Sequence, residues 1–283
     1  MIIDKSVMQD FPWVKTNAHK HSRGRLAVFS GGELHTGAAR LVANCGARIG
    51  AGWVVMFASI DAARIIAAHE TAIMVEEYEY SPALPQKITD FRAIVIGPAL
   101  GFGKGKYAAI KSLLGLENKL VLDADALMMI ANDTSSHGLR EIIKGREFET
   151  IITPHEGEFS RLFVHSADDL DEKIEITQVA AAKINATIVH KGAQTVIASP
   201  NGDVAVLENS TPWLATAGTG DCLAGMIGGL VAQGLDGMSA AKIAVYLHSE
   251  CGKAFGAGLM AQDIPNILPE ILNEYAPNEL RAQ

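Results

Sequence analysis

The chain has 283 residues, of which 48% are hydrophobic, and a formal net charge of −8 at pH 7. This size and composition fit one large α/β domain, or two small ones, with a sizeable buried core. The acidic balance argues against non-specific binding to nucleic acid or to an anionic membrane, because both would repel the surface. A phosphate-bearing ligand would therefore have to be held by local backbone donors.

The cysteines and the N-terminal residues bear on where the protein works. Cys45, Cys222 and Cys251 lack the spacing of a zinc site or a redox CxxC motif, so we expect reduced structural thiols in a cytoplasmic protein. Residues 1–24 lack the continuous apolar segment of a signal peptide. No apolar run approaches the roughly 20 residues that span a bilayer. These features predict a soluble protein.

Short apolar runs alternate with longer helix-like segments along the chain. The runs predict strands at residues 25–29, 54–58, 93–96, 120–122, 150–152, 187–190 and 195–198. This β-then-α repetition predicts an α/β fold with a central, mostly parallel sheet and helices on both faces. Ser-Pro and Leu-Pro steps within residues 78–86 predict an excursion or edge loop. Because no low-complexity linker divides the chain, we predict one domain over residues 1–283, with residues 1–24 as an N-terminal extension.

Polar and glycine-rich segments directly follow several of the predicted strands. In chain order they are Gly31-Gly32, residues 97–101, residues 123–125, residues 153–158 and Lys191-Gly192. Ligands of open α/β sheets bind beyond the carboxyl ends of the strands, so we expect these segments to cluster there. The chain has no GxxxxGK(S/T) motif, which excludes the P-loop as the means of binding a nucleotide.

Residues 216–221, TAGTGD, form the most informative segment, a small-residue turn that leads into an apolar helix. Gly218 and Gly220 allow close backbone approach to a ligand, and the first N–H groups of the helix would serve as anion donors. Asp221 lies in the first helical turn, where the helix dipole favours the ionised carboxylate. Such a carboxylate beside an anion hole suits proton abstraction from an attacking hydroxyl. The alternative is that Thr219 or Asp221 merely caps the helix.

This segment resembles the GxGD signature of the ribokinase-like fold, and residues 215–225, ATAGTGDCLAG, are similar to the ADP/ATP-dependent NAD(P)H-hydrate dehydratase family. Four further segments match that family in the expected order: GGELHTGAARLVA from Gly31, GPALG from Gly97, DADAL from Asp123 and TPHEGEFSRL from Thr153. KGAQT, residues 191–195, is similar to the family's nucleotide-binding segment. The matches span nearly the whole chain.

The resemblance implies a ribokinase-like fold and a carbon–oxygen lyase that repairs a damaged nicotinamide nucleotide. With ADP or ATP it would dehydrate the S-epimer of hydrated NADH or NADPH through a phosphorylated intermediate. Asp221 would take the proton of the C6 hydroxyl, and the backbone around Gly218 and Gly220 would stabilise the transferred phosphoryl group. Mg²⁺ would accompany the nucleotide, and the enzyme would be a cytoplasmic homo-oligomer such as a homotetramer.

The resemblance also implies which residues contact the ligands. The substrate would lie against Ala38, Ala39, Gly97, Gly101, Asp123, His155 and Asp221. The nucleotide would bind to Lys191, Gly192, Ala193, Gln194, Thr195, Thr219 and Gly220. Glu158 is the candidate metal-associated carboxylate.

Several of these residues have a plainer interpretation. The small residues at 38 and 39 also suit helix–sheet packing, and residues 97–101 also suit an ordinary strand-to-helix turn. Asp123 would orient Mg²⁺ through water, whereas we expect Asp125 to cap the following helix. Lys191 would reach nucleotide phosphates, and the alternative is a solvated lysine at a strand end.

Residues 153–158 combine an early proline with first-turn acidic residues, which predicts a helix start. His155 stands at the carboxyl end of a predicted strand, where it would donate hydrogen bonds to a substrate phosphate or ribose. A structural histidine is the alternative, and the position favours function.

Three other functions stay open from the sequence. A ribokinase-like kinase of a vitamin-precursor alcohol, hydroxymethylpyrimidine or a thiazole, would share the GTGD chemistry. A catalytically silent nucleotide-binding module would not need Asp221. An NAD-dependent oxidoreductase is disfavoured because the Gly31-Gly32 turn lacks GxGxxG spacing.

Two segments depart from the family pattern. Ala99 stands where the family often has glycine, and residues 210–213 read STPW where it often has Gly-Asn-Pro-Gly. These departures bear on substrate contacts more than on the reaction. The sequence leaves open ADP against ATP, the oligomeric state, and whether the chain is fused to an epimerase domain, which nothing in it resembles.

Overall fold

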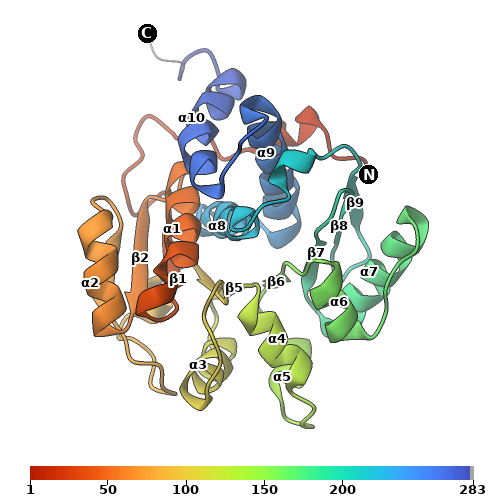
Figure 1. Cartoon of the computed structure of the whole chain (residues 1–283). Coiled ribbons are helices and arrows are strands. Elements are labelled where there is room, and N and C mark those ends of the chain that lie inside the picture. Colours follow the sequence, from red (N-terminus) through yellow and green to blue (C-terminus); the bar gives the residue numbers. More distant parts are fainter. Residues whose placement is uncertain (281–283) are drawn as a thin grey trace.

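The structure is organised around one twisted sheet. The computed structural model describes residues 1–280, and within them the sheet has nine strands in the order β3-β2-β1-β4-β5-β6-β7-β8-β9 (Figure 1). The strands are β1 (Arg25–Phe29), β2 (Trp53–Ala58), β3 (Met74–Glu77), β4 (Ala93–Ile96), β5 (Lys119–Leu122), β6 (Thr150–Ile152), β7 (Thr187–His190), β8 (Thr195–Ala198) and β9 (Val204–Leu207). Neighbours from β3 to β7 pair in parallel, and only the β7–β8 and β8–β9 pairs among the described strands are antiparallel. The prediction of a mostly parallel sheet is confirmed.

All seven predicted strands are present, and their ends agree with the prediction to within one residue. β3 and β9 were not predicted from the sequence. β3 is an edge strand whose exposed residues include Glu76 and Glu77, so it lacks the apolar run of a buried strand. β9 pairs with β8 as a hairpin across Asn201-Gly202-Asp203, a turn signal that should have revealed it. Residues 78–86 leave the edge strand as a loop, as predicted.

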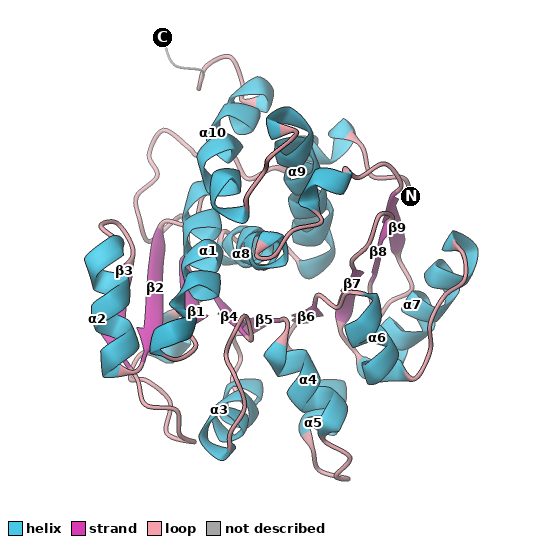
Figure 2. Ribbon diagram, in the orientation of Figure 1, coloured by secondary structure: helices cyan, strands magenta, loops and turns pink. Residues whose placement is uncertain are grey.

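Helices cover both faces of the sheet because successive strand residues point to opposite sides (Figure 2). In β1, Leu26 and Val28 join the core on one face, while Ala27 and Phe29 join the core on the other. The first face carries α1 (Thr36–Arg48), α2 (Ile60–His69), α8 (Thr219–Ala232), α9 (Gly237–Phe255) and α10 (Ile264–Tyr275). The second carries α3 (Lys104–Leu114), α4 (Asp125–Asn132), α5 (Leu139–Lys144), α6 (Glu156–Phe163) and α7 (Leu170–Ile184).

The strand order reverses beside β1, because β2 and β3 extend the sheet to one side of it and β4 to β9 extend it to the other. At such a point the loops that leave adjacent strands diverge to opposite faces, and a crevice opens at the carboxyl edge. The glycine loops after β1 and β4 flank this crevice, followed along the edge by the polar segments after β5, β6 and β7. The predicted site segments therefore share one edge.

Helices α1 and α8 pack closely because glycines face each other across their contact. A Cβ on Gly225 would lie 2.2 Å from the carbonyl oxygen of Val42, and a Cβ on Gly229 would lie 2.6 Å from that of Gly46. Neither contact would be possible with a side chain at these positions. The close approach fixes the start of α8, which carries Asp221, against α1.

Residues 1–24 pack on the domain that follows them. Ile3 donates its N–H to Val206 of β9 at 2.8 Å, and a short 3₁₀ helix, Lys5–Asp10, lies against α9. Ile3, Val7 and Met8 are buried in the core of the first face. Within residues 1–280, no helix combines the length and the hydrophobicity needed to cross a bilayer.

The glycine contact predicts the effect of Gly225→Ala. The added methyl group has no room against the Val42 carbonyl, so we expect the free energy of unfolding to fall by about 1–3 kcal/mol. Urea denaturation of both proteins measures this change. Gly37→Ala in α1 is the matched control: no atom lies within 4 Å of the point where its methyl group would sit, so it should be neutral or stabilising by up to about 1 kcal/mol. Equal stability of Gly225→Ala and the wild type would contradict the close packing.

Candidate active site

The turn before α8 leaves backbone donors unused. Gly218 is the N-cap residue with φ 93°, and α8 begins at Thr219 without a side-chain cap. The Thr219 hydroxyl instead contacts the carbonyls of Leu214 at 2.8 Å and Thr216 at 3.0 Å, which holds the turn in shape. The alternative that Thr219 or Asp221 caps the helix is therefore wrong. Within the described residues, the N–H groups of residues 219–221 find no hydrogen-bond acceptor, as an anion site requires.

Four charged side chains meet beside this helix start, those of Lys191, Asp123, Glu158 and Asp221. Lys191, which directly follows β7, places Nζ 2.9 Å from Oδ1 of Asp123, which directly follows β5. The Asp123 side chain is 2% exposed and that of Lys191 18%. A Cβ on Gly220 would lie 3.2 Å from Nζ of Lys191, so the ammonium adjoins the first turn of α8. The alternative of a solvated lysine at this strand end is therefore wrong.

The pKa of Asp221 reflects these neighbours. Burial raises it, the like charges of Asp123 and Glu158 raise it further, and Lys191 offsets part of the rise, so that it reaches about 7. Burial lowers the pKa of Lys191, because it disfavours the charged ammonium, but the attraction of Asp123 and Glu158 outweighs burial and holds this pKa above the usual value. Asp221 is therefore a carboxylate that exchanges its proton near neutral pH, as a general base must.

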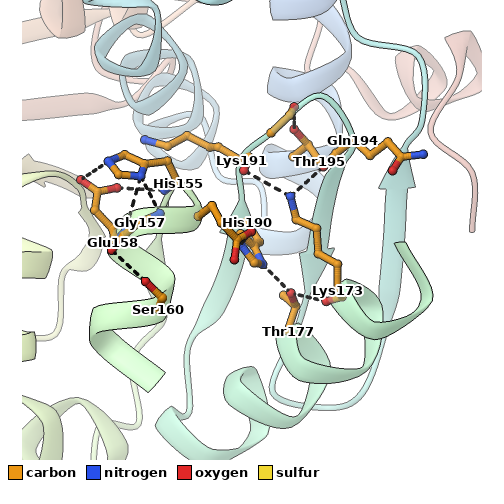
Figure 3. Close-up of polar contacts among 12 residues, drawn as sticks. His155, Gly157, Glu158, Ser160, Lys173, Thr177, His190, Lys191, Gln194 and Thr195 are labelled. Atoms are coloured by element: carbon orange, nitrogen blue, oxygen red, sulfur yellow. Dashed lines mark hydrogen bonds and ion pairs between the residues drawn. The ribbon is translucent and has the colours of Figure 1, made fainter. Parts of the chain in front are cut away.

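His155 and Glu158 form a reciprocal cap at the start of α6 (Figure 3). Nδ1 of His155 accepts from the N–H groups of Gly157 at 3.0 Å and Glu158 at 3.3 Å, and Oε2 of Glu158 accepts from the N–H of His155 at 2.9 Å. Because Nδ1 is an acceptor, the neutral ring carries its proton on Nε2. The side chain is 59% exposed and its Nε2 lies 3.6 Å from Oε1 of Glu158, so a ligand can reach Nε2–H from the solvent side.

The helix start predicted at residues 153–158 is confirmed, with His155 itself as the cap. Glu158 has a raised pKa, mainly because burial disfavours its charged form. Its carboxylate still interacts with both the cap and the charge cluster around Lys191.

The loops after β4 and β5 interlock through backbone contacts. Gly97 has φ 130°, and a Cβ there would lie 1.8 Å from the carbonyl oxygen of Asp123. The N–H of Gly101 donates to Oδ2 of Asp125 at 2.7 Å. The prediction that Asp125 caps the next helix is therefore wrong: the N-cap is Ala124, and Asp125 holds the neighbouring loop instead. Ala124 has φ 47° and ψ −117°, a strained turn conformation that keeps Asp123 at the cluster.

The other predicted ligand contacts lie on α1, in the turn after β7 and at the start of β8. Ala38 is partly exposed on α1, whereas Ala39 is fully buried in the core, so only the former offers its side chain to a ligand. Gly192, Ala193 and Gln194 are exposed in the turn between β7 and β8. Thr195 is buried at the start of β8.

Sequence reasoning missed Lys173, which shapes this turn from α7 (Figure 3). Its buried Nζ donates to the carbonyl of Gln194 at 2.9 Å and, more weakly, to that of Lys191 at 3.3 Å. A lysine in the first turn of an ordinary amphipathic helix gives no sequence signal of such a role. Its contacts hold the backbone that follows β7 in a fixed position.

Comparison with known proteins adds the decisive observation. A model of the NAD(P)H-hydrate dehydratase family matches residues 26–274. The chain belongs to the NAD(P)H-hydrate dehydratase family. It is 32% identical over 278 residues to the bifunctional NAD(P)H-hydrate repair enzyme Nnr of Moorella thermoacetica, which covers 92% of this chain and 51% of that protein. The chain thus spans about half the length of the curated relatives it matches.

Solved structures match over almost the full length. The ADP/ATP-dependent NAD(P)H-hydrate dehydratase from Bacillus subtilis, co-crystallised with ATP and Mg²⁺, has a TM-score of 0.84 at 30% identity, covering 95% of this chain and 96% of that one. A ribokinase-like superfamily protein from Enterococcus faecalis has a TM-score of 0.84 at 24% identity, covering 97% and 96% of the two chains. The predicted ribokinase-like fold is confirmed.

The structure shows the conformation and contacts of the two segments that depart from the pattern of the NAD(P)H-hydrate dehydratase family. Ala99 has φ 48°, a left-handed conformation that glycine adopts without strain, and its carbonyl would meet a Cβ on Gly31 at 2.0 Å. Trp213 lies in a short 3₁₀ helix, Pro212–Leu214, and is 47% exposed. Thr211 and Leu214 of the same segment pack against Gly252 of α9.

The raised pKa of Asp221 predicts that the wild-type carboxylate costs stability. Because the folded pKa of about 7 lies above the ordinary 3.8, the contribution of this group is most favourable below about pH 4 and is lost as the pH rises through 7. We expect Asp221→Asn to raise the free energy of unfolding at pH 8 by at least about 1 kcal/mol, with the gain vanishing near pH 4. Urea denaturation across this range measures it.

Asp171→Asn, at an exposed site on α7, is the control and should change little at either pH. A gain for Asp221→Asn that is independent of pH would contradict the raised pKa.

Proposed function

We propose that this chain catalyses the ADP- or ATP-dependent dehydration of the S-epimer of hydrated NADH and NADPH, which makes it a carbon–oxygen lyase of nicotinamide nucleotide repair. The observation that carries the proposal is Asp221, a carboxylate with a pKa of about 7 in the first turn of a helix whose N–H donors are unused. Membership of the NAD(P)H-hydrate dehydratase family supports it, as does the likeness to the Bacillus subtilis dehydratase.

Asp221 takes the proton from the C6 hydroxyl of the hydrated ring, and the freed oxygen attacks the terminal phosphoryl group of the nucleotide. The backbone N–H groups around residues 217–220 bind the oxygens on which negative charge develops in the transition state. The lone pair of the ring nitrogen then breaks the C6–O bond and releases inorganic phosphate, and loss of a proton from C5 restores the dihydropyridine. The protein contributes position and electrostatics, and the substrate's own electrons drive the elimination.

Two groups of residues hold the two ligands in this scheme. The substrate lies against Ala38, Gly97, Gly101, Asp123 and His155, with Nε2–H of His155 donating to a phosphate or ribose oxygen. The nucleotide binds to residues 191–195 together with Thr219 and Gly220. Lys191 supports the proposal because its ammonium adjoins both Asp123 and the first turn of α8, where the transferred phosphoryl group would arrive.

The carboxylates suit Mg²⁺ held jointly with the nucleotide. Among residues 1–280 no group of three or more His, Cys, Asp or Glu side chains is placed to hold a metal by itself. Carboxylate oxygens are hard ligands, and Mg²⁺ commonly combines one or two of them with phosphates and water. Asp123 and Glu158 would hold such an ion through water, and it would neutralise charge on the phosphates.

We propose a single domain over residues 1–283 with an N-terminal extension at 1–24, working in the cytoplasm as a homo-oligomer such as a homotetramer, without nucleic-acid or membrane partners. Three buried free cysteines, Cys45, Cys222 and Cys251, support a reducing compartment.

The test is recovery of reduced nicotinamide absorbance from purified hydrated NADH, with ADP, with ATP and with neither. We expect recovery that requires one nucleotide and falls by about 10²–10⁴-fold in Asp221→Asn, which is the usual contribution of general-base catalysis. Asp171→Asn is the matched control and should retain full activity. Absence of recovery with either nucleotide, from protein shown to be folded, would reject the dehydratase proposal and favour kinase activity on a vitamin-precursor alcohol.

The pH dependence of the same reaction tests the role of Asp221. Because the base must be ionised, we expect kcat/KM to decrease as the pH falls below about 7, which gives the profile an acidic limb. Asp123→Asn removes a like charge and frees Lys191 to attract Asp221, so its residual activity should show the limb at lower pH. Profiles of kcat/KM against pH for both proteins measure this. A limb that stays in place in Asp123→Asn would contradict the electrostatic assignment.

A further inference from the structure

A pocket of about 630 Å³ lies along α1, beside the candidate active site. It is bounded by the outer face of α1, the end of α2, the start of α10 and the loop before α8. This volume is in the range of sites that hold nucleotide-sized ligands. The polar residues that line this α1 pocket are Arg40, Asn44, Arg48, His69, Glu70, Thr216, Gln262 and Asn266.

The α1 pocket carries positive charge in a protein that is acidic overall. Glu70, the carboxylate among its described lining residues, is already engaged: Nε of Arg40 lies 2.7 Å from Oε1, and Nδ2 of Asn44 donates to both carboxylate oxygens at 3.1 Å. Arg48 has no hydrogen-bond or ion-pair partner among residues 1–280 and is exposed. An unpaired guanidinium is suited to phosphate oxygens, which it binds in a bidentate manner.

The floor of the α1 pocket touches the catalytic turn. A Cβ on Gly218 would lie 2.8 Å from both Leu41 and Ala261, which line the pocket, and 3.9 Å from a carboxylate oxygen of Asp221. Lys191 and the turn after β7 approach the helix start from the side of Gly220 instead. Asp221 therefore stands between two regions, one toward β7 and one toward α1.

We propose that the α1 pocket binds the phosphate-bearing half of hydrated NADH or NADPH remote from the reacting ring, and that Arg48 contacts its phosphate groups. This inference rests on the proposed function. It assigns the side of Asp221 toward α1 to the substrate, which leaves the side toward β7 to the phosphoryl donor. His69 donates Nδ1–H to the carbonyl of Ile65 at 2.8 Å, so its Nε2 is left as an acceptor for a ribose hydroxyl.

Steady-state kinetics of Arg48→Gln test the proposal. Loss of a charged hydrogen bond predicts a KM for the hydrated substrate about tenfold higher, with kcat at saturation and the KM for ADP or ATP unchanged. The increase should be equal for NADH and NADPH hydrates if Arg48 contacts the pyrophosphate, and larger for NADPH hydrate if it contacts the 2′-phosphate. The dissociation constant of NADPH, measured by its fluorescence, should rise by the same factor without any turnover.

Two further variants keep the result interpretable. Arg64→Gln on α2 removes an exposed arginine that pairs with Asp61 outside the α1 pocket and should leave both constants unchanged. Asn266→Trp obstructs the pocket from α10 without removing a charge and should raise the KM for the hydrate as well.

If Arg48→Gln and Asn266→Trp both keep the wild-type KM and NADPH affinity in an active enzyme, the α1 pocket does not bind substrate. A rise in the KM for ADP or ATP instead would assign the pocket to the phosphoryl donor and overturn the inference. Inactivity of the wild type itself would reject the proposed function, which is a distinct outcome.

Discussion

The ion pair between Lys191 and Asp123, at 2.9 Å, is the interaction that holds the site together. It places one cation among three acidic groups, Asp123, Glu158 and Asp221, in a region where burial makes each charge costly. Without Lys191 the carboxylates would repel one another unopposed. With it, Asp123 has an ion-pair partner, and Asp221 is left as the group that gains or loses a proton near pH 7.

The backbone supports this arrangement from several directions. The parallel sheet brings the ends of β5, β6 and β7 to one edge, and the N–H of Lys191 donates to the carbonyl of Pro154 at 2.8 Å across that edge. Lys173 holds the turn that follows, and Gly97 allows the β4 loop to approach Asp123. A shift of any of these loops would change the distances between charges, and hence the pKa of Asp221.

The packing of α1 on α8 connects the charge cluster to the proposed substrate region. Gly225 and Gly229 bring the two helices together, so that the start of α8 lies against the outer turns of α1. One side of the turn that begins α8 then faces the sheet edge with Lys191, and the other faces Leu41 and Ala261 in the α1 pocket. The same contact that stabilises the fold thus separates the two binding regions proposed for a two-substrate reaction.

Local signals in the amino-acid sequence were enough to predict the fold class, seven of the nine described strands and the order of the site segments, because apolar runs and glycine-rich turns are local features. They did not predict β3, an edge strand whose exposed glutamates interrupt the apolar pattern, and they led to the wrong prediction that Asp125 caps a helix. The folded chain was needed to show that Asp125 holds Gly101, that Lys191 pairs with Asp123 68 positions away, and that Arg48 lines a pocket. The physical reason is that these contacts join residues from different strands and helices, and their burial sets both the charges and the space between them.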